Sequence, residues 1–210
     1  FRRVLFRSFP SDQPSWQTHT NDQWSVGRQF LYEFGNDADQ MIRWARLGPV
    51  LLTLLLIFFI YLWSLSLVGP WWALVPASLF ALSPTILAHG HYVTTDVGSA
   101  FGAVIALYYF FRSYKAPSLK NLIIAGIAFG IAELCKSSML LLIPYFITIA
   151  GIFFLNGIYR DRTIDGHISI KKMRHGFFRH AKNLTIIFLA GFAAIYLVYS
   201  VVTINYPADR

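Results

Sequence analysis

The chain has 210 residues, of which 56% are hydrophobic and 13% are charged, and its mean hydropathy is +0.51. A soluble domain of this size could not cover so much apolar surface with polar side chains, so the composition excludes a water-soluble globular domain and favours a membrane protein. The formal net charge is +8, and the single cysteine, Cys135, excludes an intramolecular disulfide.

The first eight residues, FRRVLFRS, read like the translation of a sequencing-library adapter. We therefore leave residues 1–8 out of the fold prediction, and their three arginines overstate the basicity of the rest. A basic cytoplasmic leader is the alternative interpretation. Under the adapter interpretation the chain is a fragment of a longer protein.

Residues 9–46 combine Trp, Phe and Tyr with Gln, Asn, Ser and Asp. Aromatic residues among polar ones are typical of helices lying in the membrane interface, so this region is predicted to be a first extracytoplasmic loop with interfacial helices. An ordered soluble loop is the alternative. A helix is expected to restart at Asn36 or Asp37 and to enter the membrane through Arg43, Trp44 and Arg46.

Six apolar runs follow and predict an all-α, polytopic transmembrane helix bundle over residues 47–204. The expected spans are about 47–68, 70–88, 97–111, 122–134, 139–158 and 184–204. Pro76 and Pro84 are expected to bend the second span. The third and fourth carry small-residue pairs, Gly98 with Gly102 and Gly126 with Gly130, which should let these two neighbours pack closely as an antiparallel pair.

The distribution of Lys and Arg predicts the orientation, because loops retained in the cytoplasm carry the excess of basic residues. Residues 159–183 hold seven Lys or Arg against two Asp and are predicted to be a basic cytoplasmic loop. The connection 112–121 has three basic residues and no acid, and it lies on the same side. Residues 89–96 and 133–138 then face the extracytoplasmic side.

Three charged residues border the short third and fourth spans: Asp96, Glu133 and Lys136. A charge beside lipid is costly and usually faces a cavity, so these residues predict a polar site at the outer membrane surface, with His91 as a further candidate. A lysine there could hold a phosphate while a carboxylate positions a hydroxyl. The alternatives are helix capping by Thr94, Thr95 or Asp96, and snorkelling of Lys136 to the headgroups.

Three strings carry a family resemblance: FGNDADQMIRWARLGPVLL, LSPTILAHGHYVTTDVGSAFGAVIALYYFF and IAFGIAELCKSSMLLLIP. Together, from about Phe34 to Pro144, they resemble the GT-C membrane glycosyltransferases related to protein O-mannosyltransferases and lipid A aminoarabinose transferases. The resemblance implies transfer of a sugar from a polyprenyl-phosphate donor to an acceptor hydroxyl on the extracytoplasmic side, with inversion at the sugar carbon.

The resemblance also implies residue roles. Asp37, with Asp39 as a second candidate, looks like an acid of the first outer loop, close to Arg46. Asp96 looks like the acid that opens the helix after the second outer loop, and Lys136 looks like the residue that holds the donor phosphate. The family's general base follows a first transmembrane helix, and no residue here matches it. The fragment by itself is therefore expected to be inactive.

The predicted partners are the polyprenyl-phosphate sugar donor, membrane lipids and an acceptor protein, lipid or glycan, in the plasma (inner) membrane. No cofactor and no metal site is predicted, because His167, His175 and His180 are spaced irregularly. Nucleic-acid binding is not expected, since topology and anionic lipids explain the basic segment. A transporter or lipid flippase, and a structural membrane subunit, are the alternative functions.

Overall fold

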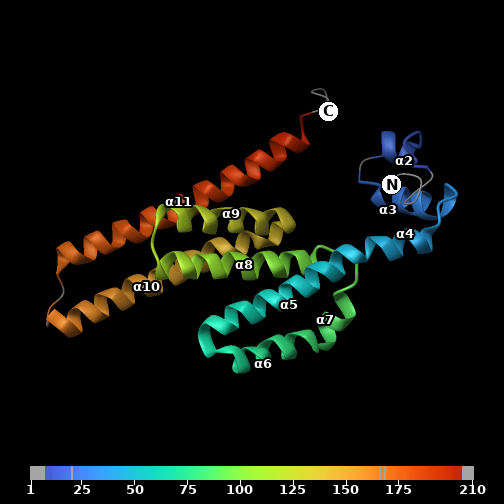
Figure 1. Cartoon of the computed structure of the whole chain (residues 1–210). Helices are drawn as coiled ribbons and strands as arrows, with labels where there is room; N and C mark the ends of the chain where they lie inside the picture. Colours follow the sequence, from blue (N-terminus) through green and yellow to red (C-terminus); the bar gives the residue numbers. More distant parts are fainter. Residues whose placement is uncertain (1–7, 20, 166, 168, 205–210) are drawn as a thin grey trace.

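The computed structural model describes residues 8–19, 21–165, 167 and 169–204, and every regular element within them is helical (Figure 1). Most of the predicted adapter segment, residues 1–7, lies outside the described residues. Ser8 is described, and its hydroxyl donates a hydrogen bond to the carbonyl oxygen of Phe34 at 2.6 Å.

The N-terminal region consists of short helices set to one side of the long ones in Figure 1. They are α2 (Pro14–Gln17), α3 (Gln23–Arg28), a π-helix, η1 (Gln29–Glu33), and α4 (Ala38–Ala45). The predicted restart at Asp37 is confirmed, because its carboxylate accepts a hydrogen bond from the backbone N–H of Gln40 at 3.0 Å and caps α4. The side chains of Trp16, Trp24 and Tyr32 are exposed.

Helix α5 (Leu47–Val68) has the bounds predicted for the first span. The second predicted span is instead two helices, α6 (Pro70–Ala81) and α7 (Pro84–His89), with a break at Leu82 and Ser83. Pro84 causes the break, because it has no backbone N–H to donate a helical hydrogen bond and its ring would collide with the preceding turn of a continuous helix. Pro76 is accommodated inside α6.

The third and fourth predicted spans correspond to helices α8 (Asp96–Lys115) and α9 (Leu119–Cys135), both longer than the predicted apolar runs. They pack as the expected antiparallel pair, and Gly102 permits it, because a Cβ at this position would lie 2.8 Å from the Cα of Ala132. The prediction for Gly126 and Gly130 is wrong. These two glycines face α11 (Ile170–Val202), where a Cβ on Gly130 would lie 2.7 Å from the carbonyl oxygen of Gly191.

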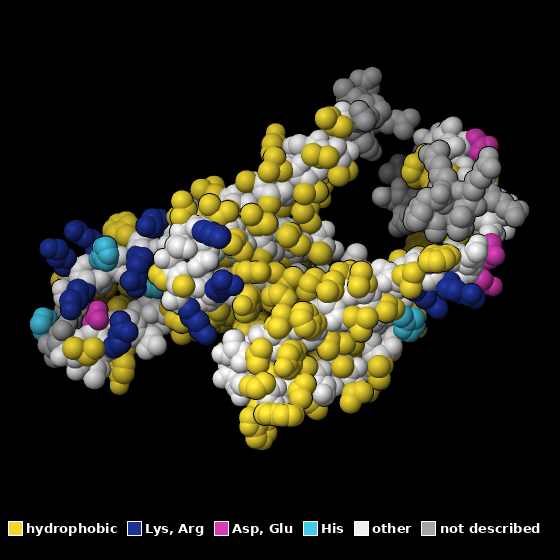
Figure 2. All heavy atoms as spheres, in the orientation of Figure 1, with side chains coloured by type: hydrophobic (Ala, Val, Ile, Leu, Met, Phe, Trp, Pro, Cys, Tyr) yellow, Lys and Arg dark blue, Asp and Glu magenta, His cyan; other side chains and the backbone are white. Residues whose placement is uncertain are grey.

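Helix α10 (Leu142–Asp165) follows a short 3-10 helix, η2 (Ser137–Leu141). The predicted loop 159–183 is mostly helical, since α10 continues to Asp165 and α11 already begins at Ile170. The predicted spans stop at these basic residues because the predictions followed hydropathy. The helices continue through them, because Lys and Arg are good helix formers. Figure 2 shows Lys and Arg side chains gathered where α10 ends and α11 begins.

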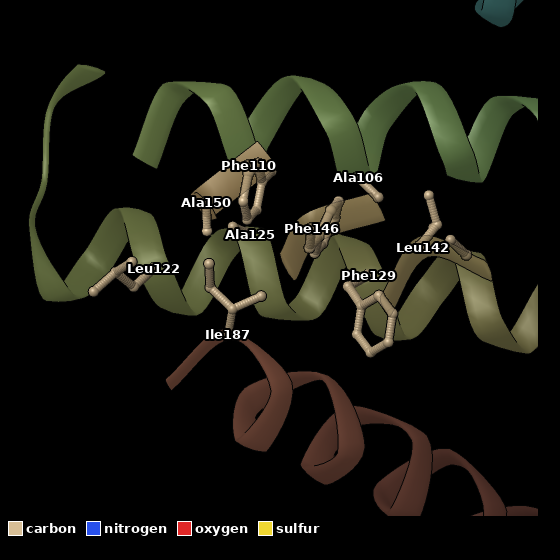
Figure 3. Close-up of a cluster of buried hydrophobic side chains, with 10 residues drawn as sticks. Ala106, Phe110, Leu122, Ala125, Phe129, Leu142, Phe146, Ala150 and Ile187 are labelled. Atoms are coloured by element: carbon tan, nitrogen blue, oxygen red, sulfur yellow. The ribbon is translucent and has the colours of Figure 1, made fainter. Parts of the chain in front are cut away.

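The core of the bundle lies among α8, α9, α10 and α11 (Figure 3). Its largest side chains are Phe110, Phe129 and Phe146, which are fully buried. The rings of Phe110 and Phe146 stack with their centroids 4.1 Å apart, so α8 and α10 meet at this point. Small residues, Ala106, Ala125 and Ala150, fill the space around the rings.

The surface of the bundle is largely apolar, and Figure 2 shows hydrophobic side chains covering the face that holds α5 and α6. Apolar surface of this extent indicates contact with lipid. Within the described residues, three continuous helical stretches are long and apolar enough to cross a membrane: Ala38–Val68, Ser137–Ile164 and Ile170–Val202. The number of six spans and the extracytoplasmic side of the first loop stay predictions.

Candidate functional site

The chain reverses direction between consecutive long helices, and this brings several helix ends to one end of the bundle. Helix α5 begins there after Arg46, α7 ends there at His89, α8 begins there at Asp96 and α9 ends there at Cys135 (Figure 1). Residues 40 positions apart in the sequence therefore become neighbours.

Asp96 and Lys136 form an ion pair at this end. The ammonium of Lys136 donates to Oδ1 of Asp96 at 2.7 Å, and the side chains remain 40% and 56% exposed for Lys136 and Asp96 respectively. Lys136 has an extended backbone between α9 and η2, so its side chain does not follow the direction of the side chains on α9. The pair is therefore held by α8 and α9 together and stays open to a ligand.

Lys136 also controls the ionisation of Asp96. The hydrogen bond from Lys136, then its positive charge, then a hydrogen bond from Thr94 hold the pKa of the Asp96 carboxyl below its ordinary value. Asp96 is therefore a carboxylate at neutral pH. It cannot act there as a proton donor, whereas it can orient a cation or a hydroxyl.

The capping alternative is not supported by the contacts of this turn. Thr95 is the N-cap residue of α8, and its side chain makes no capping hydrogen bond. Asp96 lies in the first turn, where a negative charge is favourable beside the helix N-terminus. Its carboxylate nevertheless points to Lys136 on another helix, so local capping does not explain the acid.

The loop that precedes Asp96 is fixed to α5 by a residue that the sequence prediction missed. The hydroxyl of Thr53 lies 2.9 Å from the carbonyl oxygens of both Pro49 and Gly90. A Cβ on Gly90 would lie 2.6 Å from the carbonyl oxygen of Ile86 and 3.0 Å from the Thr53 hydroxyl oxygen, so only glycine fits. A polar residue within the apolar run 47–68 was the available signal.

The other predicted site residues lie near the same helix ends without joining the pair. Glu133 is on the last turn of α9, and one of its carboxylate oxygens is buried with no hydrogen-bond partner among the described residues. His91 packs against Tyr92, with ring centroids 4.5 Å apart. Asp37 caps α4, and Arg46 lies between α4 and α5. Within the described part of the chain, no hydrogen bond or salt bridge connects these four residues to Asp96 or Lys136.

Three helical stretches long and apolar enough to cross a membrane indicate an integral-membrane protein, and the carboxylate–ammonium pair between α8 and α9 gives it a polar site at one end of the bundle. The family model described as dolichyl-phosphate-mannose-protein mannosyltransferase matches residues 32–166. The chain therefore belongs to this family of membrane glycosyltransferases. The matched segment contains both partners of the ion pair. No curated protein and no solved structure matches the chain.

Family membership favours the glycosyltransferase interpretation over the transporter or flippase alternative. The match ends before α11, although α11 packs closely on α9 through Gly126, Gly130 and Gly191. The helices that carry Asp96 and Lys136 are thus inside the family match, and one of their main packing partners is outside it.

Proposed function

We propose that the protein transfers a sugar from a polyprenyl-phosphate donor to an acceptor hydroxyl at the extracytoplasmic face of the plasma (inner) membrane. The observation that carries this proposal is the exposed ion pair between Asp96 and Lys136, inside the segment matched by the mannosyltransferase family. We further propose that Lys136 holds the donor phosphate and that Asp96 positions Lys136 and the reacting groups.

The chemistry of Lys136 suits a phosphate that leaves during the reaction. In a single displacement the acceptor oxygen forms a bond to the anomeric carbon, while the bond from that carbon to the phosphate oxygen breaks and its electrons stay on the phosphate. An ammonium has three N–H donors, so one bond to Asp96 leaves donors for a phosphate oxygen. The positive charge then stabilises the charge that grows on the phosphate. The acceptor proton passes to a carboxylate base that we do not assign.

The distribution of charge supports the proposed orientation. The end opposite the ion pair is strongly basic, and the positive-inside rule assigns such an end to the cytoplasm. Its basic residues are Arg112, Lys115, Lys120, Arg160, Arg162, Lys171, Lys172, Arg174, Arg179 and Lys182. Seven acids lie at or near the other end with four cations, Arg28, Arg43, Arg46 and Lys136; the acids are Asp12, Asp22, Glu33, Asp37, Asp39, Asp96 and Glu133. The site would then face a lipid-linked donor on the extracytoplasmic side.

Binding of a short-chain polyprenyl phosphate to the purified protein in detergent tests the role of Lys136 directly. Lys136→Met should weaken binding about tenfold or more, because a charge-assisted hydrogen bond to the phosphate is lost. Lys120→Met removes the same charge from the opposite end of the bundle and is the matched control, with affinity close to that of the wild type. Equal affinities of the wild type and Lys136→Met would contradict the assignment.

A further inference from the structure

A pocket lies at the end of the bundle opposite the ion pair, and the proposed sugar transfer does not use it. Its volume is about 360 Å³, and it lies where the last turn of α8 meets α10 and α11. The polar residues that line it include Tyr114, Lys115, Arg160, Arg179, His180 and Asn183.

The pocket is electropositive. Lys115, Arg160 and Arg179 line it, and none of its lining residues is an acid. Among the described residues, no carboxylate oxygen lies within 4.0 Å of these three cations. An adjoining hollow of about 630 Å³ shares Arg160, Arg179 and His180 and adds three further cations with one acid, Asp161. Lys115, Arg160 and Arg179 come from three helices and are exposed at the pocket, where a bound anion would interact favourably with all of them.

Two buried polar groups beside these cations make no hydrogen bond to any described residue. The Tyr114 hydroxyl and Nδ1 of His180 are buried without a hydrogen-bond partner in the described part of the chain. The two rings stack with centroids 5.4 Å apart, and Tyr114 also stacks on Phe153 at 5.0 Å. Burial without a partner is unfavourable for such groups, so a ligand with acceptor oxygens would stabilise the site.

The surroundings indicate where the ligand comes from. The side chains of Tyr159, Ile164 and Phe177 are exposed on the same ends of α10 and α11, among the cations. Exposed aromatic and aliphatic residues mixed with Lys and Arg are typical of a protein surface at the level of lipid headgroups. Phe111 and Phe153 add an apolar wall to the pocket itself.

We infer that the pocket formed by Tyr114, Lys115, Arg160, Arg179 and His180 binds the phosphate group of an anionic membrane lipid. The guanidinium groups supply paired N–H donors that match phosphate oxygens, and the Tyr114 hydroxyl supplies a further donor. Because α8 ends here, its C-terminal dipole does not attract anions, and the side-chain cations provide the attraction. A soluble phosphomonoester offers the same group, and the test distinguishes these sources.

The test measures binding of dioleoyl phosphatidic acid to the purified protein in detergent by native mass spectrometry. Dioleoyl phosphatidylcholine, which has the same acyl chains and no net charge, is the lipid control. The double variant Arg160→Gln/Arg179→Gln should bind phosphatidic acid about 100-fold more weakly, at about tenfold for each guanidinium contact. The matched variant Arg112→Gln/Lys120→Gln removes two exposed charges from the same end outside the pocket and should bind within about threefold of the wild type.

Tyr114→Phe distinguishes the loss of a ligand contact from misfolding. It removes the unpartnered hydroxyl, so the ligand-free protein should melt at or above the wild-type temperature while its affinity for phosphatidic acid falls severalfold. Competition by glycerol 3-phosphate would assign the pocket to a soluble phosphomonoester, and its failure to compete would assign it to the lipid. Equal weakening in both double variants, or unchanged affinity in Arg160→Gln/Arg179→Gln, would overturn the inference. Both results leave the polyprenyl-phosphate experiment on Lys136 unaffected.

Discussion

Lys136 lies just after the last residue of α9, and its ammonium contacts Oδ1 of Asp96, the first residue of α8, at 2.7 Å. The bond spans the open end of a tightly packed antiparallel helix pair. Because Gly102 sets the close approach of these helices, the ion pair depends on small residues within the bundle as well as on its own charges.

Sugar transfer should depend on both partners of the pair. In the full-length protein, Asp96→Asn and Lys136→Met should each lower turnover by about 10²-fold or more, as expected for removal of a preorganised electrostatic contact. Release of polyprenyl phosphate from a labelled lipid-linked sugar, measured in membranes, reports this turnover. Near-normal rates in both variants would contradict the assignment of Asp96 and Lys136 to the site. Lys120→Met is the control and should leave the rate unchanged.

The contribution of the pair to stability should depend on pH with a definite sign. Because the pKa of Asp96 is lowered in the folded protein, its contribution is fully present above the ordinary value of 3.8 and is lost as the pH falls through the lowered pKa. The difference in melting temperature between the wild type and Asp96→Asn should therefore be constant near neutral pH and should shrink below pH 3.8. A difference that grows on acidification would contradict this linkage.

The contact between α9 and α11 should not tolerate a larger residue. Gly130→Val places side-chain atoms against the carbonyl oxygen of Gly191 and should destabilise the protein by about 1–3 kcal/mol, as overpacking does. Gly151→Ala is the control, because a Cβ at that position meets no atom within 4 Å. Thermal unfolding in detergent should show a lower midpoint for Gly130→Val, and a midpoint at or above the wild-type value for Gly151→Ala.

Truncation of the largest core rings should be costly. Phe110→Ala should destabilise the protein by about 3–5 kcal/mol, because it leaves a cavity where the ring stacks on Phe146. Phe58, on α5, is 56% exposed and is the matched control. Phe58→Ala should have a much smaller effect in the same thermal measurement, and equal effects would contradict the described core.

The orientation of the bundle can be measured with single cysteines. With Cys135→Ala as background, Thr94→Cys and Lys120→Cys place exposed thiols at opposite ends of the bundle. A membrane-impermeant maleimide added to intact cells should label the Thr94→Cys protein and leave the Lys120→Cys protein unlabelled until the cells are opened. The reverse pattern would contradict the proposed extracytoplasmic site.

Hydropathy predicted the bounds of a long helix well where the helix ends at the same residue as its apolar run. The span 47–68 is the clearest example, since its bounds match α5. Agreement fails at residues 159–183, because a helix can leave the membrane and continue through basic residues with its backbone bonds intact. Pro84 was recognised as a site of bending, and it interrupts the helix completely.

The candidate site was predictable in part. Asp96 and Lys136 could be assigned to one end of the bundle, because the number of helices between them fixes the ends at which they lie. Their direct contact could not be predicted, since it depends on the extended backbone at Lys136. The same limit applied to Gly126 and Gly130, because sequence alone does not say whether α8 or α11 covers their face of α9.

The length of α11 exceeds the thickness of a membrane. Its 33 residues extend about 50 Å at 1.5 Å per residue, whereas the hydrocarbon core of a bilayer is about 30 Å thick. The basic residues of α11 all lie in its first half, so the apolar turns after Lys182 are the part that matches the bilayer. The basic turns would then project from the membrane as one continuous helix, which holds Arg179 and His180 at a fixed distance from the lipid-facing turns.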